Sequence, residues 1–205
     1  MRLVPPLAAA LIPLAAIAAP ATPALGATDA GVAQVEASLA ATQTMTAHFV
    51  QTDGKGRQLD GQFSLKRPGR IRFDYGRAAN MLVVSDGQRL NFLDYSAPQM
   101  SSWPIDKTPL KPLLAANPDL GRIARILPTP DPRVLLLRAR DARHPEFGTL
   151  ILAFVKAPGA PAGLRMEGWT AIDALNKKTS VKLDDQRYNV AVADSAFTFT
   201  PIRKK

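Results

Sequence analysis

From residue 45 onward, most of the chain is a succession of short alternating apolar segments separated by turn signals, and this pattern restricts the fold most. In GQFSLKRPGRIRFDY, residues 61–75, Phe63 and Leu65 alternate with polar residues before the turn signal Pro68-Gly69. The alternation resumes after the turn, at Ile71, Phe73 and Tyr75. Alternation on both sides of a turn predicts an antiparallel hairpin with one apolar face.

Further segments of this kind follow along the chain. They are MTAHFVQT, NMLVVS, QRLNFLDY, RVLLLRAR, GTLILAFV, GLRMEGWTAID and TSVKLDDQRYN. Asp86-Gly87 is a strong two-residue hairpin signal between the second and third of them. Hairpins in this number predict one large antiparallel sheet, which must twist and curl. If it does not close fully, its apolar concave face needs a cover.

Two stretches have helical rather than alternating periodicity. In residues 31–45, apolar and small side chains recur every three or four positions, which predicts an amphipathic helix. In KTPLKPLLAANPDLGRIARILP, residues 107–128, the leucines and isoleucines suit two short helices broken at Asn117-Pro118. We expect these helices to cover the concave face, so the predicted fold class is β-rich (α+β).

The first 27 residues have the composition of an export signal. Arg2 is followed by an Ala- and Leu-rich stretch and then by small residues and prolines, with suitable cleavage positions near Gly26 or Ala27. The apolar stretch is short and contains prolines, which disfavours a retained membrane anchor. We therefore expect residues 1–27 to be removed, and residues 28–205 to form a single soluble domain outside the inner membrane.

The charge and the cysteine count narrow the range of partners. The formal net charge is +9, but the basic residues are scattered, so acidic proteins or anionic membrane surfaces are better candidates than nucleic acid. The chain has no cysteine, which excludes disulfides and a lipid-modified N-terminal cysteine.

Residues that would indicate catalysis or metal binding are sparse. His48 and His144 do not lie at metal-ligand spacing, and no nucleophile elbow, phosphate loop or dinucleotide motif occurs. Asp184 and Asp185 are adjacent in a predicted strand, so their side chains point to opposite faces. We therefore expect neither an enzyme nor a metal site nor a cofactor.

The apolar residues leave two interpretations open. LILAF, residues 150–154, and VLLL, residues 134–137, are apolar on both faces, so something is expected to pack on each side of these strands. An ordinary core under the helices explains them, and composition alone favours it. The alternative is that one face lines a cavity for a lipid.

The ordered set of segments AHFVQ, KRPG with RIRFDY, VSDGQRLNFLD, KTPLKPLLA and FTFTP resembles the periplasmic outer-membrane lipoprotein carrier proteins of LolA type. The resemblance covers essentially the whole exported part. It implies an open, incomplete antiparallel β-barrel with an α-helical lid. It also implies binding of the acyl chains of lipoproteins that an inner-membrane ABC-type complex releases, and delivery to an outer-membrane acceptor. It implies a monomer without cofactor.

The resemblance also suggests roles for individual residues. The arginine of the family's Arg-Pro motif is Arg67 here, and it is expected to bond to the backbone of the lid and hold the lid closed. By alternation, the candidate acyl-chain cavity residues are Phe49, Phe63, Leu65, Ile71, Phe73, Leu90 and Phe92. The candidate lid residues are Leu110, Leu113, Leu114 and Ile123.

Three other functions remain to be weighed. The outer-membrane acceptor of the same fold needs a lipidated cysteine, which this chain lacks. A carrier of another amphiphile, such as a glycolipid or a polyprenyl lipid, would have the same kind of cavity. An envelope-stress sensor domain of this fold usually has a second domain, for which 205 residues leave little room.

Overall fold

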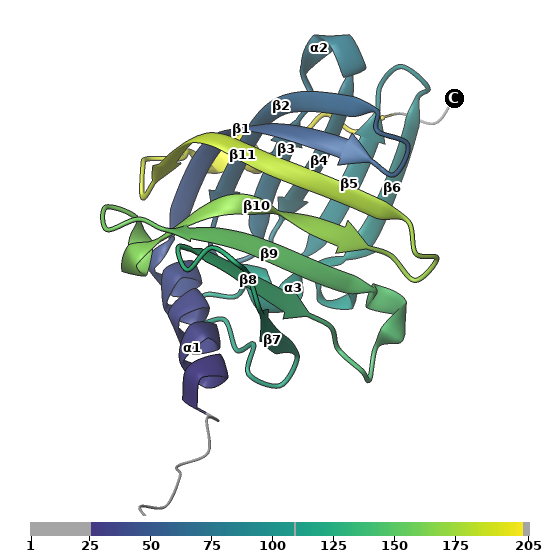
Figure 1. Cartoon of the computed structure of the whole chain (residues 1–205). Helices are drawn as coiled ribbons and strands as arrows, with labels where there is room; N and C mark the ends of the chain where they lie inside the picture. Colours follow the sequence, from purple (N-terminus) through teal and green to yellow (C-terminus); the bar gives the residue numbers. More distant parts are fainter. Residues whose placement is uncertain (1–25, 109, 203–205) are drawn as a thin grey trace, which may run out of the picture.

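The computed structural model describes residues 26–108 and 110–202, which form one curved antiparallel sheet with short helices at its concave face (Figure 1). The strand order is β6-β5-β4-β3-β2-β1-β11-β10-β9-β8-β7, so β6 and β7 are the two edges. The strands are β1 (Thr44–Asp53), β2 (Gln58–Lys66), β3 (Arg70–Asp74), β4 (Met81–Asp86), β5 (Arg89–Asp94), β6 (Gln99–Pro104), β7 (Ala124–Leu127), β8 (Val134–Ala139), β9 (Thr149–Lys156), β10 (Leu164–Ile172) and β11 (Lys178–Tyr188). The predicted class, an open antiparallel β-barrel, is confirmed.

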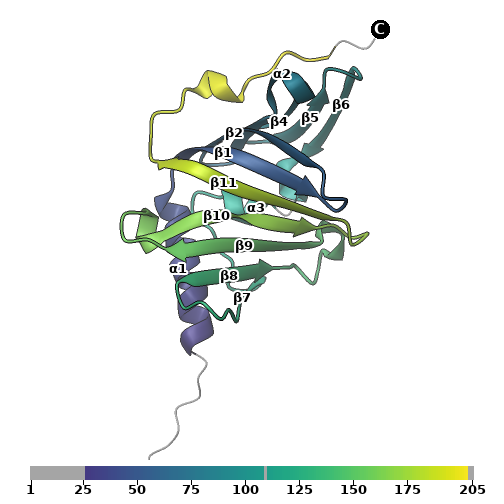
Figure 2. The same cartoon turned by 45° about the horizontal axis from the view of Figure 1, so that its top comes forward.

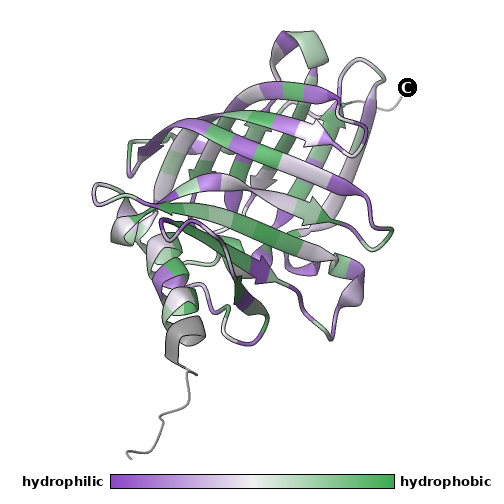
Figure 3. Ribbon diagram, in the orientation of Figure 1, coloured by the Kyte–Doolittle hydropathy of each residue, from purple (hydrophilic) through white to green (hydrophobic). Residues whose placement is uncertain are grey.

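The hairpin around Pro68-Gly69 forms as the alternation predicts. Phe63 lies opposite Phe73, and Leu65 lies opposite Ile71, so these side chains share one face. This face is the concave one, and Figure 3 shows the alternation of apolar and polar residues along the strands around it.

The sheet curls strongly enough for side chains of distant strands to meet. The ring of Trp169 on β10 lies 6.0 Å from that of Phe63 on β2 and 5.8 Å from that of Phe73 on β3. A β-bulge between Met166 and Gly168 contributes, because an extra residue bends the strand. The bulge immediately precedes Trp169 and therefore helps to aim its ring inward.

Helix α1 (Gly26–Ala41) packs against the concave face of the second half of the sheet. Its residues Val32, Val35 and Leu39 are buried there, as the helical periodicity predicts. The helix ends earlier than predicted, because Met45 already belongs to β1 and is buried in the alternating pattern of that strand.

The segment between the two edge strands crosses the opening of the sheet. It contains the short helices η1 (Ile105–Lys107) and α3 (Lys111–Leu114). We call residues 105–115, apart from Pro109, the lid. Figures 1 and 2 show α3 lying inside the curve of the sheet.

The prediction of a second short helix after Asn117-Pro118 is wrong. Leu120 to Ala124 form a turn, with bonds from the amides of Ile123 and Ala124 to the carbonyl of Leu120, and the chain continues as strand β7. The spacing of apolar residues is too short here to distinguish a helix from a strand. Pairing with β8 and packing against α1 decide for the strand.

The outer face of the sheet is covered only in part. Figure 2 shows the C-terminal segment, with the helix η4 (Asp194–Phe197), running over the outer side of the sheet. It packs on β3 to β5, where Leu82, Val84 and Leu93 are buried with Phe197. Ile151 and Ala153, which lie on the outer face of β9 within LILAF, remain partly exposed. The expectation that LILAF is covered on both sides is therefore wrong for its outer side.

The predicted export signal lies almost wholly outside the described residues, which begin at Gly26, and the basic end of the chain, residues 203–205, also lies outside them. Among the helices of the described part, none has the length and apolar character that a membrane span requires.

Gly168 is predicted to be indispensable for the bulge that orients Trp169. Its φ is +143°, and a Cβ there would collide with the backbone carbonyl of Val181 on β11. Gly168→Ala should lower the free energy of unfolding by about 2 kcal/mol or more, measured by urea denaturation. Gly159→Ala, at a turn with open space around it, is the control and should change it by less than about 0.5 kcal/mol. Equal stability of the two variants would contradict this account.

Candidate functional site

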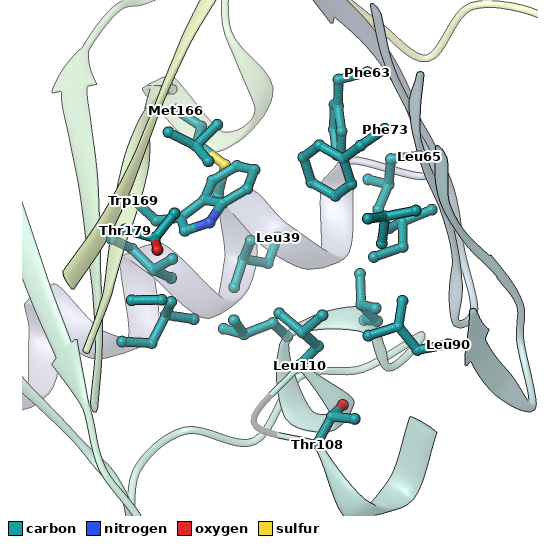
Figure 4. Close-up of a pocket in the computed structure, with 18 of the residues that line it drawn as sticks. Leu39, Phe63, Leu65, Phe73, Leu90, Thr108, Leu110, Met166, Trp169 and Thr179 are labelled. Carbon is teal, nitrogen blue, oxygen red and sulfur yellow. The ribbon is translucent and has the colours of Figure 1, made fainter. Parts of the chain in front are cut away.

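A cavity of about 540 Å³ lies between the concave face of the sheet, the end of α1 and the lid (Figure 4). Its size is typical of a small-molecule site. The wall is mostly aliphatic and aromatic, and it combines both halves of the sheet with α1 and the lid. The apolar side chains of its interior are Leu39, Met45, Phe63, Leu65, Ile71, Phe73, Val83, Leu90, Leu110, Leu113, Leu114, Leu150, Leu152, Phe154, Leu164, Met166, Trp169, Ala171 and Val181.

Five of the seven residues predicted to line the cavity do so: Phe63, Leu65, Ile71, Phe73 and Leu90. The other two lie on the same face of the sheet but outside the lining. Phe49 is fully buried behind it, with its ring 5.3 Å from that of Phe73 and 5.0 Å from that of Tyr75. Phe92 lies opposite Val83, two residues beyond Leu90, and is only partly buried.

Three of the four predicted lid residues, Leu110, Leu113 and Leu114, point into the cavity. Ile123 does not belong to the lid. It precedes the edge strand β7, where its carbonyl accepts a bond from the amide of Arg140, and its side chain packs against the core under α1.

The second half of the sheet contributes a wall from which no candidate cavity residue was named, although a cavity-lining face of LILAF was one of the two interpretations of the sequence. Leu150, Leu152 and Phe154 on β9 and Trp169 on β10 face the cavity. LILAF is apolar at every position, so its sequence does not show which face lines a cavity. What the sequence does not reveal is that the sheet curls until these strands face β2 and β3.

Polar groups in the wall bond to other protein groups. The hydroxyl of Tyr75 donates to Gln51 Oε1 at 2.8 Å, and burial raises the pKa of this phenol to about 12. The hydroxyl of Tyr188 accepts a bond from the amide of Met166 at 3.1 Å. Thr42 donates to the carbonyl of Ser38. Because these groups bond within the protein and most of the wall is aliphatic or aromatic, the interior of the cavity offers a guest mainly apolar contact.

Arg67 lies in the turn between β2 and β3, where this turn meets the end of α1 and the lid, and it is only 8% exposed. Its Nε donates to the carbonyl of Thr42 at 2.8 Å, just beyond the end of α1. Its Nη1 donates to the carbonyls of Leu113 and Ala115, the latter at 2.9 Å. Among the described residues, no carboxylate pairs with it.

Within the described part of the chain, the hydrogen bonds of the Arg67 guanidinium go to backbone carbonyls. Burial lowers the pKa of its guanidinium to about 10, so the group is still protonated near neutral pH. The turn that follows adds one more bond to the lid, from the amide of Gly69 to the carbonyl of Leu114 at 2.9 Å. The arginine and its turn thus contact three consecutive residues at the end of α3.

One side of the cavity opens to the surface, and charged side chains join the apolar ones in the lining there. Trp103 at the edge strand β6 is 48% exposed, and Lys107, Glu146 and Asp173 join it in the lining. A guest with an apolar part and a polar part would be oriented by this arrangement, with the apolar part inside.

The two histidines are at least partly exposed, and each lies beside a different acidic residue. His48 Nε2 lies 3.2 Å from Asp60, and the ring of His144 stacks on Phe147 with its Nδ1 3.1 Å from Glu146. In the described part of the chain, no group of three or more acidic, histidine or cysteine side chains could hold a metal ion.

Comparison with known proteins gives a consistent result. The family model described as outer membrane lipoprotein carrier protein LolA matches residues 40–200. A protein of Methylobacillus flagellatus named outer-membrane lipoprotein carrier protein is 26% identical over 181 residues, which cover 82% of this chain and 84% of that protein. A protein of Bordetella avium with the same name is 27% identical over 186 residues, 87% of each chain.

Solved structures resemble the chain more distantly. A LolA superfamily protein from Nitrosomonas europaea aligns with a TM-score of 0.43 and 12% identity, covering 82% of this chain and 96% of that one. A DUF1329 family protein from Desulfovibrio piger aligns with a TM-score of 0.47 and 12% identity, covering 86% and 99%.

The cavity is predicted to accept a fatty acid with its tail inward. The only two tryptophans of the chain, Trp103 and Trp169, line the rim and the interior and can report on this by fluorescence. A long-chain fatty acid brominated at its tail should quench Trp169, measured in Trp103→Phe. The same acid brominated near the carboxyl group should quench Trp103, measured in Trp169→Phe. If neither tryptophan is quenched, the cavity does not admit an acyl chain.

Proposed function

The chain belongs to the outer membrane lipoprotein carrier protein LolA family, and on this premise we propose that it binds the acyl chains of lipoproteins in the cavity under its lid. It would receive them from an ABC-type releasing complex of the inner membrane and deliver them to an acceptor at the outer membrane. The observation that carries the proposal is the cavity itself, whose wall is mostly aliphatic and aromatic.

The energetics explain why such a cargo needs a carrier. Removing apolar groups from water is worth about 0.8 kcal/mol per methylene, so one long acyl chain represents on the order of 10 kcal/mol. A lipoprotein with several chains does not cross water unaided at a useful rate. A mostly aliphatic and aromatic wall suits chains that differ in length, because apolar contact is not directional.

The lid supports a further part of the proposal, that Arg67 acts as a latch for it. In the closed state the guanidinium bonds to the carbonyls of Leu113 and Ala115. When the lid opens, water replaces these carbonyls as the hydrogen-bond acceptors of the guanidinium. The hydration of the charge then offsets much of the free energy that the lost bonds contributed. The closed lid is therefore stable but can be displaced by cargo.

A latch of this kind favours release. Cargo that holds the lid open must compete with the bonds between Arg67 and the lid, and these bonds form again when the cargo leaves. The affinity for cargo is lowered by the free energy of closing the empty protein. This competition is a reason for a carrier to place a buried charge beside an apolar cavity.

We also propose the location and the domain organisation. Residues 1–27 would be an export signal, cleaved near Gly26 or Ala27, and residues 28–205 would act in the periplasm as a single monomeric carrier domain. The role is non-enzymatic, because binding and handing over an acylated protein makes and breaks no covalent bond.

Native mass spectrometry of the protein isolated from cells tests the function. We expect a bound lipoprotein, and we expect Leu90→Gln to reduce the loaded fraction several-fold because a polar amide then faces the cargo. Phe92→Gln is the matched control, two residues along the same face but outside the lining. A glycolipid or a polyprenyl lipid in place of the lipoprotein would overturn the proposal.

Arg67→Leu should still admit cargo but retain it. Without the latch the empty closed state is less favourable, so transfer to an acceptor should slow about tenfold or more, or become misdirected. The amide of Gly69, which bonds to the lid, should exchange faster with deuterium in the unloaded variant.

Arg70→Leu serves as the control for this variant. It removes a positive charge from the same turn, but Arg70 pairs with Asp194 on the outer side and makes no bond to the lid. Normal transfer by Arg67→Leu would refute the assignment of the latch.

A further inference from the structure

Two hairpin tips of the sheet are built on the same plan. In residues 53–57, Asp53 Oδ1 accepts bonds from the amides of Lys55 and Arg57 at 2.9 and 3.0 Å. In residues 173–177, Asp173 Oδ1 accepts bonds from the amides of Leu175 and Lys177 at 2.9 and 2.8 Å. Each tip is closed by a bond from the aspartate amide to the carbonyl four residues on, at 3.0 Å in both.

The two tips differ at their third position, which is Lys55 in one and Leu175 in the other. Leu175 is 76% exposed, more than Trp103, Met100 or Leu59, the other exposed large apolar residues of the described part. The tip at residues 53–57 has the same backbone bonds with Lys55 at this position, so the turn tolerates a polar side chain there. The turn itself therefore does not require a leucine, and its bonded backbone holds the side chain outward.

Positive charge surrounds this leucine. Lys55, Lys177 and Lys178 are exposed, and none of them is in an ion pair within the described residues. The acidic groups within the tips are Asp53 and Asp173, whose carboxylates accept bonds from backbone amides of their own turns. Asp53 also pairs with Arg57 at 2.7 Å. The outward-facing charge of the two tips is thus positive.

The tips lie side by side at the rim of the cavity. Asp53 is paired with Thr179 across β1 and β11, and Figures 1 and 2 show the two hairpin loops next to each other at one side of the sheet. Asp173 and Thr179, at the base of the second tip, are part of the cavity lining. A surface that binds these tips therefore comes close to the opening of the cavity.

We propose that the two tips, residues 53–57 and 173–178, dock on the surface of an anionic lipid bilayer. Leu175 enters the interface between headgroups and acyl chains, and the lysines lie among the anionic headgroups. The cavity rim then faces the bilayer. This inference concerns the unloaded protein and lipid alone, so it stands or fails independently of the cargo.

A bilayer fits these tips better than a folded partner does. Stable protein interfaces usually centre on aromatic or arginine side chains in a well-packed apolar patch. The tips instead offer one aliphatic side chain on a convex surface, ringed by flexible ammonium groups. A soft surface with diffuse negative charge accommodates this shape without a preformed pocket, and the contact is weak enough to be reversible.

The absence of cysteine allows the contact to be observed at a single residue. Leu175→Cys, labelled with a polarity-sensitive dye, is mixed with vesicles of equal parts phosphatidylglycerol and phosphatidylcholine. We expect a blue shift of the dye emission at about 0.05 M salt that disappears at about 0.5 M salt, because salt screens the headgroup charge. Vesicles of phosphatidylcholine alone should give no shift. Labelled Met100→Cys, another exposed apolar position, is the control and should not respond.

Co-sedimentation with the same vesicles separates the contribution of the apolar leucine from that of the lysine charges. The full-length sequence is expressed and the protein is purified in the form that the cell produces, so all variants share one N-terminus. Leu175→Asn should weaken vesicle binding about tenfold, because its apolar side chain no longer enters the interface. The double variant Lys177→Glu and Lys178→Glu should abolish the salt-sensitive part. Lys156→Glu and Met100→Asn, at exposed positions elsewhere, are the matched controls and should bind like the wild type.

Three results would overturn the proposal. The first is no binding to anionic vesicles, and the second is equal binding to neutral ones. The third is binding that the tip variants leave unchanged. If tip variants that bind vesicles normally are instead defective in transfer to a purified acceptor protein, the tips contact a protein and not the membrane.

Discussion

A buried positive charge, which has no carboxylate partner among the described residues, connects the parts of this structure. Arg67, in the turn between β2 and β3, bonds to the carbonyls of Thr42, Leu113 and Ala115. The end of α1, the lid and the sheet therefore meet at one guanidinium. Arginine suits this position because it carries several donors, and burial that lowers its pKa to about 10 still leaves it charged. A carboxylate partner would make the junction tighter. In the latch that we propose, carbonyls that water can replace would keep the closed lid only moderately more stable than the open one.

The first half of the fold could be predicted from the sequence because local signals agree there. The turn at Pro68-Gly69 and the alternation around it fix the register of Phe63 opposite Phe73, since a slip by one residue would expose the apolar face. The stretch after Asn117-Pro118 shows the limit. A four-residue strand has no periodicity of its own, and it forms because the edge of β8 and the face of α1 are available.

Whether an apolar side chain lines a cavity or fills a core could not be read from alternation. Phe49 and Phe73 lie on the same face of the sheet, yet Phe73 borders the hollow and Phe49 is packed behind it. The difference arises from the curl of the sheet, to which the bulge before Gly168 contributes, and from the place where the lid crosses. These are tertiary features. The Arg67 position, in contrast, was found through a family motif, because no local pattern distinguishes a buried arginine from an exposed one.

The two devices that we propose lie at opposite ends of β1. Thr44 begins the strand two residues after Thr42, the acceptor of Arg67, and Asp53 ends it at the hairpin tip. A strand of this length spans about 30 Å, so the latch and the docking tips share no side-chain contacts. A bilayer that binds the tips does not by itself favour the open or the closed lid, because it touches neither Arg67 nor its acceptors. Docking would therefore position the rim, while opening would depend on whatever competes for the lid, and substitutions at the two ends should act additively.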